Sequence, residues 1–306
     1  MNRKNFIQSV AAVGAVSAVG ANAGGRTPKP PRFDISLAQW SIREFHRAKP
    51  GAEHHLDPLD FAVYAKNTCG IRGVEYVNAF YFGKEGDDAY FNELKKRADG
   101  EGVESVLIMC DRCGRVGDPS EAERIATVEK HEPWLAAAAR LGCHSIRVNA
   151  GSAGTFEEQQ KLAADGLTQL AAAAKPYGLN VIVENHGGLS SNGAWLAGVM
   201  KTVNLPNVGT LPDFGNFTID RKTGESYDRY KGMEELMPYA KGVSAKSHAF
   251  DAAGNETNTD YFKMMKIVAD AEYKGYVGVE WEGKTPGTTE GVLLTKALIE
   301  KAVAAL

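Results

Sequence analysis

Short apolar segments alternate with longer amphipathic segments from residue 33 to the C-terminus. The apolar segments are rich in β-branched residues and only a few residues long, which is typical of buried parallel strands. Eight strands are expected, at Phe33–Gln39, Gly73–Val77, Val103–Met109, Ser145–Asn149, Asn180–Glu184, Val208–Asp213, Gly242–Ser247 and Val277–Trp281. The helices between and after them are expected at Pro58–Asn67, Ala89–Glu101, Ser120–Leu141, Phe156–Tyr177, Ala194–Val203, Gly232–Tyr239, Thr259–Tyr273 and Thr288–Ala305.

The third and fourth of these helices have the clearest pattern. They carry apolar residues at helical spacing together with many alanines, and Gly142 and Gly178 follow where each should stop. Eight strand–helix units in succession predict an α/β protein with a (β/α)8 TIM barrel, in a single domain over residues 33–306. An open, doubly wound sheet is the alternative, but no Gly-x-Gly-x-x-Gly motif follows the first strand.

The first 32 residues have a different pattern. Arg3 and Lys4 precede an apolar stretch that ends near Val19, and residues 21–23 fit a small-x-small cleavage site. Residues 1–23 are therefore predicted to be a signal peptide for export to the periplasm, too short in its apolar part to remain as a membrane anchor. Residues 2–8 resemble a twin-arginine signal with one arginine changed to lysine, so both that route and the general secretory route stay open. The proline-rich residues 24–32 are expected to form a linker.

Composition narrows the range of partners. Hydrophobic residues make up 43% of the chain and charged residues 24%, as in ordinary soluble proteins, and the net charge is −3. With this charge the chain has no overall basic character that would favour nucleic acid or an anionic membrane, so a small neutral ligand is the expected partner. Homo-oligomerisation stays open.

Cys110 and Cys113 have the spacing of a redox or zinc motif, but nothing completes a zinc site. A disulfide between them would only stiffen the loop in which they lie.

Four of the predicted strands end in a potential metal ligand, and they are the last four. The ligands are Glu184, Asp213, His248 and Glu280, separated by about the length of one helix and one strand. The carboxyl ends of barrel strands meet at the face where active sites are built. Burying these carboxylates without a cation would cost desolvation and mutual repulsion, so a divalent-metal centre is predicted.

Side chains two residues apart on a strand share a face, which adds polar residues to the same end of the barrel. The pairs that follow from this rule are Arg147 with Asn149, Glu184 with His186, Lys246 with His248, and Glu280 with Glu282. Candidates for binding a sugar are Glu75, Arg147, Asn149, His186 and Glu282. Lys246 could serve as a catalytic acid or base if burial lowered its pKa, although an ion pair with Glu184 or Glu282 is the favoured interpretation.

The order Glu, Asp, His, Glu on the last four strands resembles the xylose-isomerase-like barrels known as sugar phosphate isomerases and epimerases. The resemblance covers nearly all of the chain after the predicted signal. It implies that Glu184, Asp213, His248 and Glu280 bind a divalent metal, typically Mn²⁺, with Mg²⁺, Co²⁺ or Zn²⁺ as substitutes. It also implies that Glu184 and Glu280 move protons next to a carbonyl. Glu280 is preferred to Glu282 as the ligand on the last strand, because it lies nearer the strand core.

The resemblance has two limits. The epimerases place a substrate-binding histidine three positions after the aspartate, whereas this chain has Asn216, which we keep as a substrate-binding candidate. The substrate itself is therefore not implied. The further ligands of the endonuclease IV zinc cluster are missing after His248, so DNA repair is not expected.

We therefore expect an exported, metal-dependent sugar isomerase or epimerase that works through an enediolate. The alternatives are a lyase acting on 3-keto-glycosides, a metal-dependent hydrolase, and a sugar-binding barrel without turnover. Export favours a free sugar or glycoside over a sugar phosphate.

Overall fold

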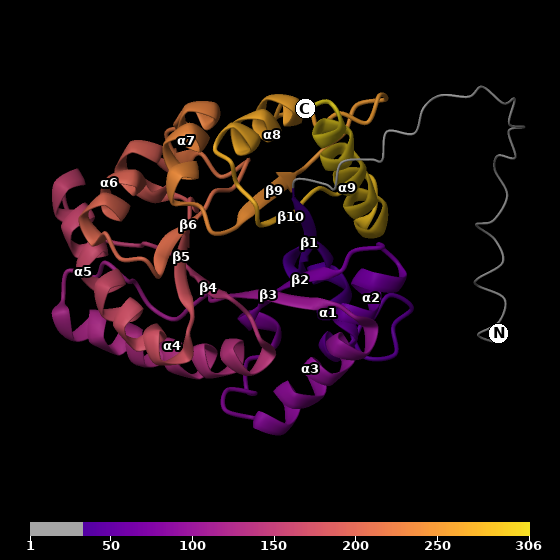
Figure 1. Ribbon diagram of the computed structural model, residues 1–306, viewed down its shortest axis with the longest axis horizontal. Coiled ribbons are helices and arrows are strands. Elements are labelled where there is room, and N and C mark those ends of the chain that lie inside the picture. The colour runs from indigo at the N-terminus through magenta and orange to yellow at the C-terminus, as the bar shows by residue number, and fades with distance from the viewer. Residues whose placement is uncertain (1–32) are drawn as a thin grey trace, which may run out of the picture. The chain divides into compact units, whose positions relative to one another are not determined.

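Eight strands pair in parallel and form a curled sheet, which confirms the predicted α/β barrel (Figure 1). The structure, a computed structural model, describes residues 33–306; the predicted signal peptide and linker lie outside the described residues. In sheet order the strands are β6 (Val208–Leu211), β5 (Asn180–Glu184), β4 (Ser145–Val148), β3 (Glu104–Met109), β2 (Gly73–Val77), β1 (Asp34–Ala38), β10 (Tyr276–Trp281) and β9 (Val243–Ser247). Two parallel bridges, Thr210 to Ala240 and Asp213 to Ser244, join the two edges of the sheet.

Helices surround these strands (Figure 1). They are α1 (Arg43–Arg47), α2 (Phe61–Asn67), α3 (Asp88–Glu101), α4 (Glu121–Leu141), α5 (Phe156–Ala174), α6 (Gly193–Val203), α7 (Arg229–Leu236), α8 (Tyr261–Asp270) and α9 (Thr288–Ala304). Short 3-10 helices lie at Gln39–Ile42, Pro58–Asp60, Asn78–Phe80, Lys175–Tyr177, Gly188–Ser191 and Met237–Tyr239. Gly142 and Gly178 adopt the left-handed conformation, with φ of 83° and 69°, and end the two helical segments as predicted.

The apolar core has two parts, because strand side chains alternate between the helices and the barrel interior. The larger part packs the strands against the helices and includes Val181, Val183 and Ile146. The smaller part contains Leu107, Ile182 and Leu211. The same strands carry polar side chains further along, so the barrel interior changes from apolar to charged toward the carboxyl ends of the strands.

Besides the short helix α1 and some of the 3-10 helices, the sequence pattern did not predict an antiparallel hairpin between β6 and α7. It consists of β7 (Thr218–Asp220) and β8 (Glu225–Ser226). Its turn is held by the backbone N–H of Lys222, which donates to Asp220 Oδ1 at 2.7 Å, and by Gly224 at φ 76°. The segment is short and mostly polar, so it gave no apolar strand pattern.

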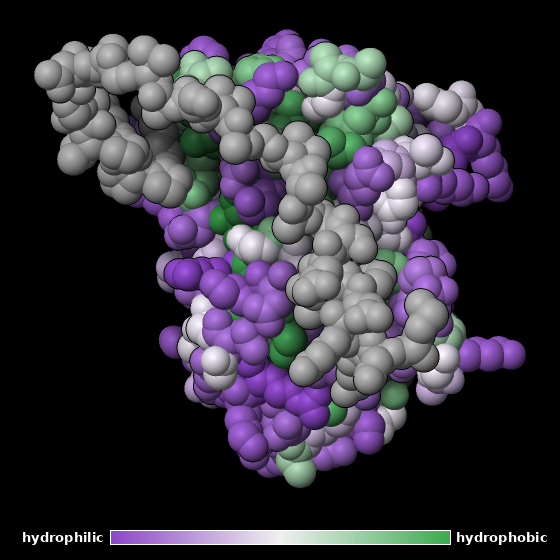
Figure 2. All heavy atoms as spheres, turned by 90° about the vertical axis from the view of Figure 1, so that its right-hand side faces the viewer, coloured by the Kyte–Doolittle hydropathy of each residue, from purple (hydrophilic) through white to green (hydrophobic). Residues whose placement is uncertain are grey.

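The surface is largely polar. The face in Figure 2 is mainly hydrophilic in its lower part, and hydrophobic residues gather mostly in its upper part. Scattered large apolar side chains, such as Ile125 and Phe82, are exposed. Among residues 33–306, none of the helices has both the length and the apolar character needed to cross a membrane.

Candidate functional site at the barrel mouth

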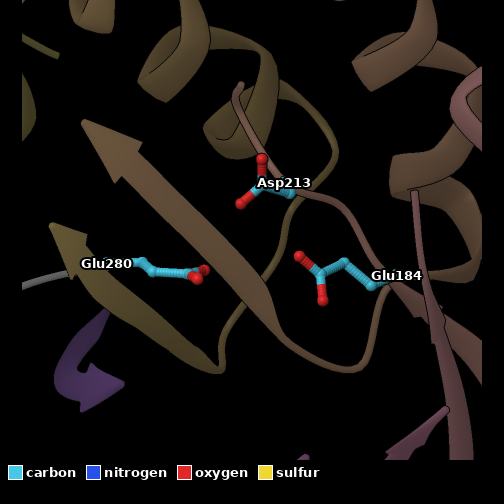
Figure 3. A group of neighbouring side chains, drawn as sticks. All are labelled: Glu184, Asp213 and Glu280. Carbon is cyan, nitrogen blue, oxygen red and sulfur yellow. The ribbon is translucent and has the colours of Figure 1, made fainter. Parts of the chain in front are cut away.

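Three carboxylates converge at the carboxyl ends of the strands. Glu184, Asp213 and Glu280 each bring one oxygen to within 4.8 Å of the others, and their side chains point toward a common region (Figure 3). Their exposed fractions are 1%, 0% and 5%. Of the two carboxylates at the end of β10, Glu280 joins the group and Glu282 does not. A buried acidic group of this kind could hold a metal ion.

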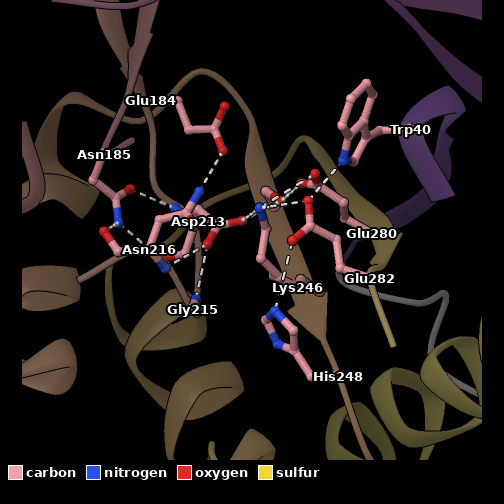
Figure 4. A network of polar contacts seen from close by, with 12 residues as sticks. Trp40, Glu184, Asn185, Asp213, Gly215, Asn216, Lys246, His248, Glu280 and Glu282 are labelled. Carbon is pink, nitrogen blue, oxygen red and sulfur yellow. Dashed lines mark hydrogen bonds and ion pairs between the residues drawn. The ribbon is translucent and has the colours of Figure 1, made fainter. Parts of the chain in front are cut away.

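Asn185, which sequence reasoning missed, fixes the turn after β6 on which Asp213 lies. Its Oδ1 accepts from the Asp213 backbone N–H at 2.7 Å, and its Nδ2 donates to the carbonyls of Asp213 and Asn216 (Figure 4). The N–H groups of Gly215 and Asn216 both donate to Asp213 Oδ1 at 2.8 Å. The Asn216 side chain then donates to Glu184 Oε1 at 2.9 Å. The aspartate is thus held rigidly, and Asn216 links it to the glutamate.

The Lys246 ammonium lies among the carboxylates. Its Nζ is 3.3 Å from Glu280 Oε1, 3.5 Å from Glu282 Oε1 and 3.8 Å from Asp213 Oδ2 (Figure 4). Burial by itself would lower the pKa of Lys246, but the nearby carboxylates, first among them Asp213, outweigh it and raise the pKa well above the ordinary value. Lys246 therefore stays protonated near neutral pH. Glu282, one of the two ion-pair partners expected from the sequence, is in contact with it.

Arg147 provides a second buried cation. Its Nε is 2.9 Å from Glu184 Oε2, and its Nη1 donates to Asp111 Oδ1 at 2.8 Å. The Asn149 amide donates to the same Asp111 oxygen at 3.2 Å. Burial alone would raise the pKa of Asp111, but Arg147 outweighs it and the pKa falls below the ordinary value. Sequence reasoning missed Asp111 because it lies between the two cysteines of the Cys110–Cys113 motif.

Two carboxyls of the cluster, Glu184 and Asp213, retain their protons more strongly than ordinary carboxyls do. Burial raises the pKa of Glu184 to about 7 against the opposing effect of Arg147, and raises that of Asp213 to about 7 against Lys246. Ser244 Oγ lies 2.7 Å from both Asp213 Oδ2 and Glu280 Oε2. Its single hydroxyl hydrogen can be donated to only one of these carboxylates at a time.

His248, expected as the fourth metal ligand, does not join the three carboxylates. Its side chain is 44% exposed, and its Nε2 lies 3.6 Å from Glu282 Oε2. The strand β9 ends at Ser247, and the N–H groups of His248 and Ala249 turn toward the Glu256 carboxylate. Strand alternation therefore stops before His248. Among the described residues the three carboxylates come together without His248, and the Lys246 ammonium lies beside two of them.

The remaining predicted residues lie in two environments. Glu75 is buried inside the barrel, where the Ser36 hydroxyl donates to its Oε1 at 2.5 Å, and burial raises its pKa to about 8. Glu282 is half-buried and accepts from Trp40 Nε1 at 2.7 Å. Burial would raise the pKa of Glu282, but His248 and Lys246 together lower it well below the ordinary value.

A cavity of about 540 Å³ opens above the cluster, within the usual size range of small-molecule sites. The side chains that line it include Trp40, Asp111, Arg147, His186, Glu280 and Glu282. A second cavity of about 410 Å³ shares His186 and Glu282 with it, and adds Asn216 and His248. Arg221 of the unpredicted hairpin lines both. Glu280 is the cluster carboxylate that lines the larger cavity.

The cysteines take no part in this site. Cys69, Cys110, Cys113 and Cys143 are all buried free thiols, and burial raises the pKa of each. Cys110 and Cys113 are not joined in a disulfide. Their side chains contribute to the apolar core.

Comparison with known proteins agrees with this architecture. A family model described as xylose isomerase-like TIM barrel matches residues 63–300, more than half of the chain. Similar solved structures include a 3-keto-D-glucoside 4-epimerase from E. coli, 16% identical over 89% of this chain and 100% of that chain, with a TM-score of 0.63. A D-psicose 3-epimerase is 15% identical over 89% of this chain and 97% of that chain, with a TM-score of 0.62.

A xylose isomerase-like barrel protein from Mycobacterium smegmatis, in complex with magnesium, is 16% identical over 89% of this chain and 97% of that chain, with a TM-score of 0.64. At these identities the likeness shows the fold. No curated protein sequence matches the chain.

Proposed function

This chain belongs to the xylose isomerase-like TIM barrel family, and we propose that it isomerises or epimerises a sugar by moving a proton at a carbon next to a carbonyl. The observation that carries the proposal is the cluster of buried carboxylates directly beside a cavity of sugar size. General acid–base chemistry at such a carbon needs a carboxylate that reaches the substrate and a group that stabilises the enediolate. Similar folds in 3-keto-D-glucoside 4-epimerase and D-psicose 3-epimerase support this class of substrate.

The steps can be assigned to side chains of the carboxylate cluster and of the cavity beside it. Glu280 takes the proton, because it is the cluster carboxylate that lines the cavity. Glu184 is the second proton-transfer group, and its pKa of about 7 suits transfer in both directions near neutral pH. The Arg147 guanidinium lines the same cavity and stabilises negative charge on the enediolate oxygen. Trp40 provides an aromatic wall against which a sugar ring can stack.

The sequence predicts a bound metal, with Mn²⁺ preferred over Mg²⁺, Co²⁺ and Zn²⁺. If one is bound, Glu184, Asp213 and Glu280 are the side chains that would hold it. A divalent ion there would polarise the substrate carbonyl. Proton exchange and metal content are separate measurements, so the reaction can be tested separately from the metal. Export by the predicted signal peptide also stays part of the proposal, and N-terminal sequencing of protein from its native host tests it.

Solvent exchange tests the reaction. The wild type is incubated in D₂O with a panel of ketoses, aldoses and 3-keto-glycosides, and deuterium next to the carbonyl is measured by NMR. A 3-keto-glycoside lyase begins with the same proton removal, so the panel covers that alternative as well. We expect exchange with at least one sugar, and a fall of about 10²-fold or more in Glu280→Gln. Glu234→Gln, which changes an exposed glutamate, is the matched control and should keep the wild-type rate. Absence of exchange with every sugar, or equal rates in both variants, would contradict the proposal.

A further inference from the structure

Every carboxylate of the cluster already has a basic side chain as its partner. Arg147 Nε lies 2.9 Å from Glu184, and Lys246 Nζ lies 3.3 Å from Glu280 and 3.8 Å from Asp213. A divalent ion needs these same carboxylates, deprotonated and free to turn toward it. It would therefore compete with two cations that belong to the protein.

The position of Lys246 is determined by the fold. The residue is 3% exposed and lies within β9, with its side chain directed into the barrel. Its aliphatic stem passes over Gly215, where an added Cβ would come within 3.3 Å of Lys246 Cγ and Cδ. A glycine at 215 leaves the space through which the stem reaches the cluster. The ammonium group then meets three carboxylates in place of solvent.

A second positive charge in this space would be strongly unfavourable. An ion bound by Asp213 and Glu280 would share both carboxylates with the Lys246 ammonium, in surroundings where water screens little. The side chain expected to complete the metal site, His248, lies outside the cluster and pairs with Glu282. The donor set that is present is therefore suited to an ammonium group.

We propose that the Lys246 ammonium is the resident cation of the carboxylate cluster and takes the place of a divalent metal, so that the wild-type chain binds no metal there. Lys246 is a positioning residue, because it contacts Glu280 and does not line the larger cavity. The inference rests on the proposed function only for the role of Glu280, since metal binding is measured without substrate.

The test compares metal uptake by the wild type and by Lys246→Met, which keeps the stem and removes the charge. Mn²⁺ alone is titrated into EDTA-treated protein, with calorimetry for affinity and electron paramagnetic resonance for bound ion. We expect one Mn²⁺ per chain in Lys246→Met, bound at least ~10-fold more tightly than by the wild type. Lys241→Met, which changes the lysine just before β9, should behave like the wild type. Asp213→Asn added to Lys246→Met should remove the new site.

The metal content of the wild type tests the inference even if Lys246→Met fails to fold. One equivalent of metal in the purified wild type, removable by EDTA with a fall in Tm, would overturn the inference. Equal Mn²⁺ affinity in the wild type and Lys246→Met would overturn it too. A wild type that takes up no Mn²⁺ and exchanges no sugar proton would contradict the proposed function and leave this inference standing.

Discussion

The polar residues at the barrel mouth form two groups that differ in burial; Figure 4 shows Glu184, Asp213, Lys246 and Glu280 of the first group, and His248 and Glu282 of the second. We call the first group the inner cluster, and it consists of Arg147, Glu184, Asp213, Lys246 and Glu280, each at most 5% exposed. We call the second group the rim, and it consists of His186, Arg221, His248 and Glu282. Arg147, Glu184, Lys246 and Glu280 lie within strands, and Asp213 follows β6 on a turn that Asn185 holds, whereas the rim residues lie after strand ends or on the hairpin. The strands and this turn therefore fix the positions of the inner charges.

Because the two groups differ in burial, substitutions in them should affect different properties, namely stability and ligand binding. Removing one partner of a buried ion pair leaves a desolvated charge and costs about 3–5 kcal/mol, whereas an exposed pair contributes about 0–1 kcal/mol. Substitutions in the inner cluster should therefore change the free energy of unfolding, and substitutions in the rim should mainly change ligand binding.

The largest effect on stability is expected for Arg147→Leu. Arg147 contacts both Glu184 and Asp111, so its loss leaves two carboxylates without their guanidinium. We expect the free energy of unfolding in urea to fall by about 3–5 kcal/mol. The control is Arg140→Leu, because Arg140 pairs with Asp88 at 2.7 Å on the surface and should cost at most about 1 kcal/mol. Equal losses in the two variants would show that burial does not distinguish the inner cluster.

Glu75 provides a further test of the difference between buried and exposed charged groups. It is a buried interior carboxyl whose Oε2 has no hydrogen-bond partner among the described residues. Burial raises its pKa from 4.5 to about 8. Between these values the folded state binds a proton that the unfolded state has lost. The contribution of Glu75 to stability therefore falls as pH rises through this window, by up to about 1.4 kcal/mol per pH unit.

Glu75→Gln should accordingly flatten the decline of the unfolding free energy between pH 5 and 8. Urea unfolding at several pH values in this range measures the slope. The exposed variant Glu234→Gln should keep the wild-type slope. A Glu75→Gln slope equal to that of the wild type would mean that Glu75 is already ionised in the folded protein.

Sequence patterns were sufficient for the barrel and for part of the inner cluster. The strands are short, rich in β-branched residues and regularly spaced, and Glu184, Asp213 and Glu280 lie at or just beyond strand ends, so parallel packing brings them together. Alternation also places Lys246 and Arg147 inside, because both lie within strands. Parallel packing and side-chain alternation follow from the backbone geometry of strands. They therefore predict positions only within the strands and at their ends.

The remainder depends on segments whose path the sequence pattern does not determine. His248 comes one residue after β9 ends, where Glu256 redirects the backbone. Asp111 and Asn185 follow strand ends, and their contacts are made to residues distant in the sequence. Arg221 reaches the cavity on a hairpin that has no apolar pattern. Hydrophobic periodicity predicts which residues are buried. It does not predict the positions of residues in loops, because hydrogen bonds set those positions.

The smallest effect is expected for His248→Ala, which tests the boundary between the two groups. The His248 side chain is 44% exposed, and its contact with Glu282 is 3.6 Å long. Its loss should change the free energy of unfolding by at most about 1 kcal/mol, because exposed pairs are weak. A sharper measurement compares Mn²⁺ affinity in Lys246→Met with that in Lys246→Met/His248→Ala. If the inner cluster supplies all the ligands, the two affinities should agree, since the three carboxylates are present in both. A loss of Mn²⁺ binding in the double variant would make His248 a ligand, as the sequence predicts, and would move this residue from the rim to the inner cluster.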